Sequence, residues 1–367
     1  MHIHSLELKN YRNYEYLNMN FDSGTTILYG DNAQGKTNIL EAIYVSATTK
    51  SHRGSKDKDI IQFEQDESHI RTQVVKSDIT RRIDMHLRKN KTKGIAIDGL
   101  PIRKSGELFG VANVIFFSPE DLSIIKDGPA ERRRFLDLEL CQLDRMYLYH
   151  YTNYNKVLNQ RNNLLKQIYF QPKLAETLDV WNQQLVQYGT EIIRSRKAFI
   201  KQLNDILKDI HGKLTGGKEL LKIQYEASVD ESNYEALLIQ KQDMDMKYQS
   251  TQVGPHRDDM SFYINDIEVR RFGSLGQQRT AALSLKLAEI EIVKQLIHDT
   301  PILLLDDVMS ELDESRRDYL LHSIHDIQTI ITCTGYDDFI KERMKINRVY
   351  KVVKGHVYPE GEVKDLG

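Results

Sequence analysis

The sequence Gly30-Asp31-Asn32-Ala33-Gln34-Gly35-Lys36-Thr37 decides the fold of this chain. It matches the pattern G-x-x-x-x-G-K-[ST] in full, and it lies between a predicted strand, 25–29, and a predicted helix, 37–47, as that pattern requires. Glycines allow the backbone to close around phosphate oxygens, while N–H groups of the loop and of the first helical turn supply positive potential. The stretch therefore predicts a site for nucleotide phosphates that extends from Gly30 through Asn38.

Two acidic residues farther along the chain complete this prediction. Residues 302–307, Ile-Leu-Leu-Leu-Asp-Asp, predict a buried parallel strand that ends in carboxylates at the sheet edge where α/β sites lie. We expect Lys36 to reach the β- and γ-phosphates of ATP. Thr37 is expected to bind Mg²⁺ through its hydroxyl, and Asp306 is expected to hold the same ion through a water molecule. Asp307 is expected to orient or activate the water that attacks the γ-phosphate.

A third motif, Ser274-Leu275-Gly276-Gln277, opens a predicted helix over 276–298. Its Ser hydroxyl, its Gly backbone N–H and the helix dipole all point toward one position, which favours an anion there. An ordinary helix N-cap is the alternative, because Ser suits that position. Its place in the chain, between the phosphate loop and the acidic strand, resembles the order in ABC ATPases, whose signature motif has the core Ser-x-Gly-Gln.

The resemblance to ABC ATPases implies a mechanism. In that family the signature motif binds the γ-phosphate held by the opposite protomer, so Ser274, Gly276 and Gln277 would bind nucleotide and Ser274 would act catalytically across an ATP-dependent homodimer. Residues 310–313, Ser-Glu-Leu-Asp, stand where the family keeps its dimer-contacting D-loop. Two protomers would enclose two ATP molecules, and hydrolysis would reopen the dimer.

The remaining pattern predicts two domains. Short alternating runs between about 70 and 102 indicate an antiparallel sheet layer. Over 131–211, apolar residues recur every three, four or seven positions, which indicates helices broken at Pro172. We predict a hairpin of two helices of roughly 40 residues each, ending near Gly212. The fold class is therefore α/β, an ABC-ATPase-type head with a mixed sheet and an antiparallel β layer. An inserted, mainly helical lobe, 119–250, splits that head into 1–118 and 251–367.

Composition limits the partners. The 367 residues carry a formal net charge of −2, so DNA binding must be local, and residues 50–104 hold 14 Lys and Arg against 8 Asp and Glu. The absence of a long apolar run predicts no membrane span, and two distant cysteines, Cys141 and Cys333, predict a reducing, cytoplasmic location. A solvated charged face is the alternative for each candidate DNA contact. These candidates are Arg53, Lys56, Arg81, Arg82, Lys89, Lys91, Lys93 and the run Arg132-Arg133-Arg134.

Several longer stretches are similar to the RecF family. They are 6–14 (Leu-Glu-Leu-Lys-Asn-Tyr-Arg-Asn-Tyr), 118–122, 254–259 (Gly-Pro-His-Arg-Asp-Asp) and 305–313. The resemblance implies that Arg12 and Asn13 approach the nucleotide, that ATP hydrolysis is weak and DNA-stimulated, and that DNA is bound in single-stranded, duplex or gapped form. It also implies a role in helping to load the RecA recombinase at gapped DNA, with RecO and RecR as partners.

Two departures from the common ABC pattern shape these expectations. Asp307 stands where many ABC ATPases have Glu, so its shorter side chain predicts slow turnover. Thr332 and Thr334 stand near the position of a switch histidine, and either one could touch the γ-phosphate. Another DNA-repair or chromosome-maintenance ATPase is an alternative function, against which the short helical insertion argues. The ATPase subunit of a transporter is a further alternative, against which Asp307 and the missing histidine argue.

Overall fold

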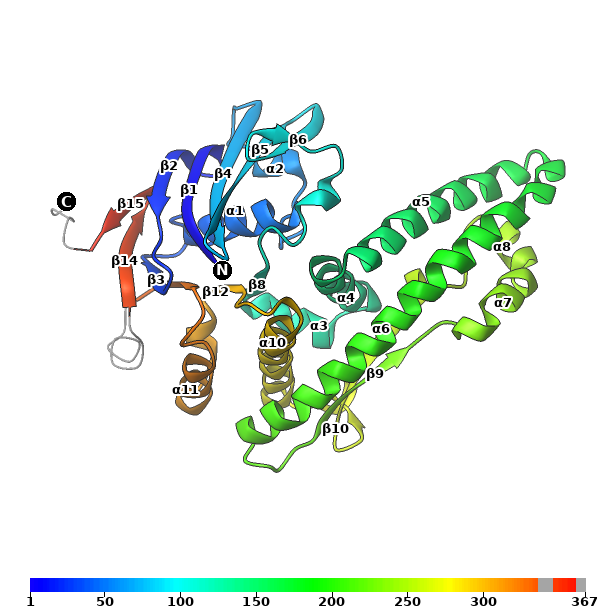
Figure 1. Cartoon of the computed structure of the whole chain (residues 1–367). Helices are drawn as coiled ribbons and strands as arrows, with labels where there is room; N and C mark the ends of the chain where they lie inside the picture. The colour runs from blue at the N-terminus through cyan, green and yellow to red at the C-terminus, as the bar shows by residue number, and fades with distance from the viewer. Residues whose placement is uncertain (336–345, 361–367) are drawn as a thin grey trace. The chain divides into compact units, whose positions relative to one another are not determined.

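The computed structural model describes residues 1–335 and 346–360 and divides into two compact units, residues 1–121 with 289–367 and residues 122–288 (Figure 1). The sequence placed 251–288 with the head, whereas the structure groups these residues with the helical unit. The reason is strand pairing: β10 (Asp259–Ile264) pairs with β9 (Leu221–Glu226) in a three-stranded sheet that β11 (Ile267–Glu268) completes.

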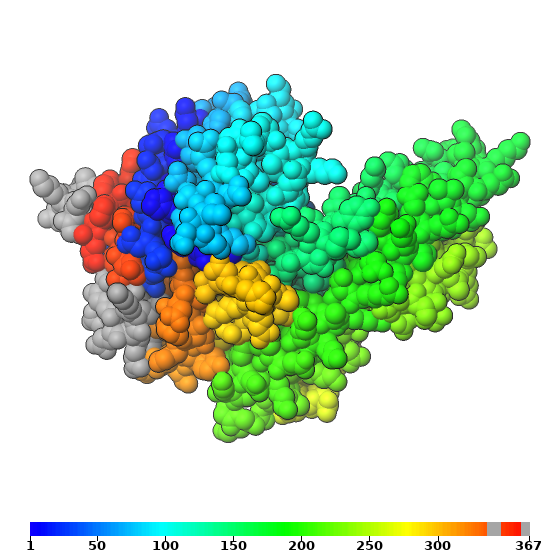
Figure 2. Space-filling view, in the orientation of Figure 1, coloured from blue at the N-terminus to red at the C-terminus, as the bar shows by residue number. Residues whose placement is uncertain are grey.

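The first unit contains two six-stranded sheets. One is antiparallel throughout, in the order β2-β1-β4-β5-β6-β7, and it confirms the predicted antiparallel layer. Its exposed face, coloured blue to cyan, lies at the surface in the space-filling view (Figure 2). Its strands are β1 His2–Tyr11, β2 Tyr14–Asn20, β4 Glu67–Lys76, β5 Ile79–Arg88, β6 Lys91–Ile97 and β7 Leu100–Pro101.

The second sheet carries the acidic strand and the strand before the phosphate loop. Its order is β15-β14-β3-β13-β12-β8, parallel except for the β14–β15 hairpin. Parallel strands covered on both faces are apolar throughout, and β12 and β3 are accordingly buried along almost their whole length. Its strands are β3 Thr25–Tyr29, β8 Val114–Phe117, β12 Ile302–Asp306, β13 Thr329–Cys333, β14 Ile346–Val353 and β15 His356–Pro359.

Helix α1 (Lys36–Thr48) contacts strands of both sheets and is buried on nearly every side. Burial on nearly every side is typical of a helix inside a core, and Ile39, Leu40, Ile43 and Val45 are all inaccessible to solvent. The phosphate loop is therefore attached to the most enclosed helix of this unit. Smaller helices of the unit are α2 Asp57–Ile60 and α11 Glu314–Ser323.

The second unit is built on α5 (Arg145–Ile168) and α6 (Leu178–Leu214), which pack side by side (Figure 1). The predicted hairpin is present and α6 has nearly the predicted length. The prediction of one long helix before α6 was wrong. It divides at Asp144, whose backbone is extended and whose carboxylate accepts a hydrogen bond from the Met146 N–H, so a separate α4 precedes α5.

The end of α6 also differs from the prediction. The helix continues three residues past His211 to Leu214, and the glycines that follow it with positive φ are Gly216 and Gly217. The remaining helices of this unit are α3 Leu122–Lys126, α4 Pro129–Leu143, α7 Tyr234–Gln240, α8 Gln242–Tyr248, α9 Val269–Phe272 and the start of α10, Leu275–Ile297. Within the described residues, no helix combines the length and apolarity needed to cross a bilayer.

Candidate nucleotide-binding site

The phosphate loop joins β3 to α1 through backbone conformations that require glycine. Gly30 has φ of 147°, and a Cβ there would lie 2.4 Å from the Val352 carbonyl oxygen of β14. Gly35 has φ of 114°, and a Cβ there would lie 2.5 Å from the Asn13 amide nitrogen. Close packing around the loop and the positive φ values therefore both require glycine at these two positions.

The N-terminus of α1 is open to an anion in the way the pattern predicts. No side chain caps it, no acidic residue lies in its first turn, and Gly35 occupies the N-cap. The Asn38 N–H donates to the Gly35 carbonyl oxygen at 3.0 Å. The first N–H groups of a helix otherwise lack intrahelical partners, and they carry the positive end of the helix dipole. Phosphate oxygens are the natural acceptors for such groups.

Lys36 lies folded against the loop. Its ammonium donates hydrogen bonds to the carbonyl oxygens of Gly30 (2.7 Å) and Asp31 (2.8 Å), and its side chain is buried. Burial lowers its pKa, while the charges of Asp307, Asp306 and Asp31 partly oppose that effect. The cation is thus held at the loop by neutral acceptors that a charged phosphate oxygen can replace.

Thr37 and Asp306, the two predicted magnesium ligands, are in direct contact. The Thr37 hydroxyl donates to the Asp306 carboxylate at 2.8 Å, and Thr332 donates to the same oxygen at 2.7 Å. The structure thus brings together residues 269 positions apart, from α1, β12 and β13. Thr332 or Thr334 was expected to touch the γ-phosphate; Thr332 lies beside Asp306, and Thr334 is exposed.

Asp307 follows with a left-handed backbone, φ 53° and ψ 23°. Its N–H donates to the Thr332 carbonyl (3.2 Å) and hydroxyl (3.1 Å) oxygens, and Ser310 donates to its carbonyl oxygen at 2.8 Å. Such a conformation costs a non-glycine residue about 1–3 kcal/mol, and it persists where the surrounding contacts hold it. Burial and the adjacent Asp306 raise the pKa of Asp307, which makes its carboxylate a stronger proton acceptor.

Two side chains of the β1–β2 turn hold the loop in place. Asn13 donates to the Gln34 carbonyl oxygen at 3.0 Å and accepts a hydrogen bond from the Asn38 amide at 2.8 Å. Tyr14, which the sequence did not single out, donates to the Gly35 carbonyl oxygen at 3.0 Å. Asn13 therefore lies at the phosphate loop, and its contacts there are with Gln34 and Asn38.

Arg12 is engaged by a buried carboxylate. Its guanidinium donates to both oxygens of Glu41 in α1, at 2.8 and 2.7 Å, and Ser51 donates to the same carboxylate at 2.6 Å. Burial would raise the pKa of Glu41, but these hydrogen bonds and the Arg12 charge hold it below its ordinary value. Glu41 was missed as a site residue, although a carboxylate on an apolar helix signals a buried cationic partner.

The Ser274 motif forms the N-terminus of α10 in the helical unit. Ser274 accepts a hydrogen bond from the Gln277 N–H at 3.2 Å, and the Gln277 side chain accepts one from the Ser274 N–H at 2.9 Å. This is a capping box, so the N-cap alternative is realised within the chain. Ser274, Leu275 and Gly276 are nevertheless exposed, which leaves their polar groups accessible to an anion from outside.

The candidate DNA contacts separate into two groups. Four of them form ion pairs on the first unit: Arg81 with Asp98, Arg82 with Asp84, Lys89 with Asp66 and Lys93 with Asp57. No ion pair within residues 1–335 and 346–360 engages the other three, which are Arg53, Lys56 and Lys91.

The arginine run of the helical unit does not form a common surface. The expectation for Arg132 was wrong, because this side chain is buried and donates to both carboxylate oxygens of Asp259, at 2.6 and 2.9 Å. Arg133 donates to the Asp258 carbonyl oxygen at 2.6 Å. This part of the run consolidates α4 against the strand that follows the 254–259 motif.

A comparison with known proteins agrees with this geometry. The family described as RecF/RecN/SMC N terminal domain matches residues 2–357, a span that includes the phosphate loop, Ser274 and the acidic pair. The chain belongs to the RecF family. A "DNA replication and repair protein RecF" from Lachnospira eligens is 59% identical over 98% of this chain and 100% of the relative. Another from Lachnoclostridium phytofermentans is 60% identical over 97% of this chain and 99% of the relative.

A solved RecF structure extends the likeness to three dimensions. The structure described as "recombination mediator protein RecF-ATP in RecFOR pathway" superposes with a TM-score of 0.92 at 34% identity, covering 97% of each chain. The ABC-type, mixed α/β fold with a second helical unit is therefore shared with a RecF-family protein over nearly the whole length. Membership of the RecF family argues against the alternative that this chain is the ATPase subunit of a transporter.

Proposed function

We propose that this RecF-family chain is an ATP-dependent DNA-binding protein of recombinational repair and replication. In this proposal ATP drives formation of a homodimer that clamps single-stranded, duplex or gapped DNA. Slow hydrolysis then releases the DNA, and the cycle helps to load the RecA recombinase with RecO and RecR. The likeness to a RecF solved with ATP and the convergence of Lys36, Thr37, Asp306 and Asp307 support this assignment.

The contact between Thr37 and Asp306 is the main observation that supports this proposal. Two oxygen donors from separate elements meet within 2.8 Å beside the open N-terminus of α1. Hard oxygen ligands of this kind suit Mg²⁺, which would be held by Thr37 and Asp306 and would neutralise phosphate charge. The loop from Gly30 to Asn38 would bind the phosphates through its N–H groups, with Lys36 on the terminal phosphates.

Asp307 would accept the proton of the attacking water. Its position is fixed by the left-handed backbone and by Thr332, which contacts both acidic residues. Its raised pKa improves proton acceptance, whereas its short side chain limits its reach, so we infer slow turnover. A slow ATPase of this kind serves as a timer for DNA release.

We infer that Ser274, Gly276 and Gln277 act on ATP bound by the partner protomer. The support is their exposure at the dipole-positive end of a 23-residue helix, with the Ser274 hydroxyl still able to donate its own proton. Arg12 holds α1 through Glu41 in this proposal and Asn13 holds the loop, so both act as positioning residues.

The test is a mixing experiment. Lys36→Ala removes the phosphate cation from one protomer, and Ser274→Arg blocks the trans contribution from the other. A mixed dimer then retains one complete site if the two halves come from different chains. Because neither variant should pair with itself, an equimolar mixture can restore up to about one half of the wild-type sites. We expect each variant alone to be inactive in DNA-stimulated hydrolysis and the mixture to recover activity in that proportion.

Ser232→Arg is the matched control, because Ser232 is also exposed in the helical unit but lies outside the motif. It should keep ATP-dependent dimerisation in sedimentation measurements, whereas Ser274→Arg should bind ATP and stay monomeric. No recovery of hydrolysis in the mixture, with ATP-dependent dimers intact in Ser274→Arg, would refute the two-chain site.

A further inference from the structure

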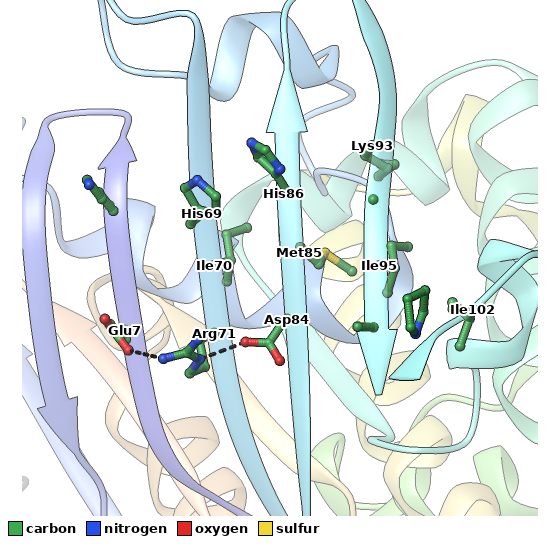
Figure 3. Close-up of a pocket in the computed structure, with 14 residues that line it drawn as sticks. Glu7, His69, Ile70, Arg71, Asp84, Met85, His86, Lys93, Ile95 and Ile102 are labelled. Atoms are coloured by element: carbon green, nitrogen blue, oxygen red, sulfur yellow. Dashed lines mark hydrogen bonds and ion pairs between the residues drawn. The ribbon is translucent and has the colours of Figure 1, made fainter. Parts of the chain in front are cut away.

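The exposed face of the antiparallel sheet carries a cluster that the nucleotide site does not use. His69 on β4 and His86 on β5 are direct cross-strand partners, and Glu67 lies two residues before His69 on the same face. Cross-strand neighbours of this kind have Cβ atoms within about 5.5 Å of each other. Figure 3 shows the two imidazoles on neighbouring strands.

The cluster is already drawn together in the structure. The His86 Nε2 lies 2.8 Å from one Glu67 oxygen, and the His69 Nε2 lies 3.9 Å from the other. The two imidazole rings stack with centroids 4.1 Å apart and planes 19° from parallel. One nitrogen of each histidine and one oxygen of Glu67 lie within 4.8 Å of one another.

We propose that Glu67, His69 and His86 form a site for a divalent transition-metal ion of the Zn²⁺ class. Two imidazole nitrogens and one carboxylate oxygen are a common donor set for Zn²⁺, with a fourth position left for water or an added ligand. Ligand atoms around a tetrahedral zinc stand about 3.3 Å apart. Small rotations of these half-exposed side chains bring the three donors from their present spacing to that one.

The surroundings leave the fourth position open. Gly94 on β6 is the cross-strand partner of His86, and its missing side chain leaves that flank of the imidazole uncovered. A hollow of about 530 Å³ adjoins the pair, lined also by Ile95 and Ile102. An ion here would join β4 to β5 and present an exchangeable position to this hollow.

The charges nearby make the cluster selective for a strongly coordinating ion. Arg71 on the same face is already neutralised by Glu7 and Asp84, at 3.1 and 2.6 Å. Lys9 is the cross-strand partner of His69 on β1, and its charge opposes a cation held only by electrostatics. Imidazole ligation can outweigh that repulsion for Zn²⁺ but offers nothing to Mg²⁺.

The experiment titrates the chelator-treated full chain with Zn²⁺ against a competing dye, without nucleotide and with excess Mg²⁺ to occupy hard-oxygen sites. We expect one tightly bound Zn²⁺ per chain, a visible absorption band with Co²⁺, and a rise in melting temperature on metal addition. His69→Ala and His86→Ala should each weaken binding by more than about tenfold, since changes even to the outer partners of ligands cost that much.

Two further variants separate ligation from general surface charge. Lys9→Gln should tighten Zn²⁺ binding, because it removes the opposing charge without touching a ligand. His356→Ala should change nothing, because His356 is an exposed histidine of β15 outside the cluster. A wild-type isotherm indistinguishable from that of the His69→Ala/His86→Ala double variant would overturn the proposal. None of these readouts depends on ATP or DNA, so they stand apart from the proposed function.

Discussion

Replacing Arg12 with leucine should destabilise the first unit strongly, because it leaves a buried charge without its partner. Glu41 is fully buried, and Arg12 supplies two of its hydrogen bonds and its only ion pair among the described residues. Breaking such a pair from one side costs about 3–5 kcal/mol. The lower end applies here, about 3 kcal/mol, because Ser51 and Tyr11 still donate to Glu41.

The melting temperature converts this cost into a measurable shift. For a unit of about 200 residues, each 1 kcal/mol lowers the midpoint by about 2–4 °C, so Arg12→Leu should melt about 6–12 °C earlier. Arg81→Leu is the matched control, because Arg81 pairs with Asp98 where both side chains are more than one-third exposed. Breaking that pair should cost less than about 1 kcal/mol.

The loss of stability in Arg12→Leu should depend on pH with a defined sign. The folded-state pKa of Glu41 is depressed, so its stabilising contribution is fully present above its unfolded-state pKa and is lost as pH falls through the folded value. In Arg12→Leu the carboxyl can relieve its burial by taking up a proton. The difference from wild type should therefore be largest at neutral pH and shrink toward pH 4–5, near the ordinary pKa of about 4.3.

A double-mutant cycle tests whether loss of the Arg12–Glu41 ion pair causes the destabilisation. Arg12→Leu/Glu41→Leu should be more stable than Arg12→Leu alone, because no buried charge remains. Effects of the two single changes that add within about 0.5 kcal/mol would refute the reasoning, since independent sites add in that way. ATP affinity measured in the double variant addresses the other predicted role of Arg12. Retained affinity supports a positioning residue, and its loss would instead support a direct nucleotide contact.

Three other changes test the site and its surroundings. Asp307→Asn should lower ATP hydrolysis by about 10²–10⁴-fold while leaving ATP binding intact, as measured by single-turnover kinetics beside equilibrium binding. Thr332→Val removes one hydrogen bond to Asp306 and should reduce the affinity for Mg²⁺ in the ATP complex by about tenfold; an unchanged magnesium dependence of hydrolysis would contradict this. Lys91→Ala should reduce the salt dependence of DNA binding by about 0.9 in log–log slope, whereas Lys58→Ala, an exposed lysine outside the candidate set, should not.

The parts of the fold that local rules govern could be predicted from the sequence. The β3 strand, α1 and the acidic strand β12 appear where alternation, glycine and apolar runs place them. The contact between Thr37 and Asp306 was also predictable, because parallel strands bring their carboxyl ends to one edge of the sheet. These inferences needed only short-range patterns and the order of motifs along the chain.

The break at Asp144 shows where periodicity alone fails. Apolar spacing continues through this position, so the pattern favoured one helix, yet Asp144 is itself extended and caps a new helix. Aspartate is among the strongest N-cap residues, and that signal was present in the sequence. The pairing of β9 with β10, across 33 or more residues, had no comparable local signal and moved 251–288 into the helical unit.

The support of the phosphate loop was the least predictable part, since it depends on segments that come together only in the folded unit. Gln34 is held through its carbonyl oxygen by Asn13 and by the Gly355 N–H, and its side-chain oxygen accepts from the Lys354 N–H at 2.6 Å. Gly355 has φ of 77°, and a Cβ there would lie 2.6 Å from the Asn13 carbonyl oxygen. The β1–β2 turn belongs to the antiparallel sheet and the β14–β15 turn to the parallel one, and both contact one loop residue. Both sheets of the first unit therefore hold the phosphate loop at the same residue, Gln34, which no local sequence pattern indicates.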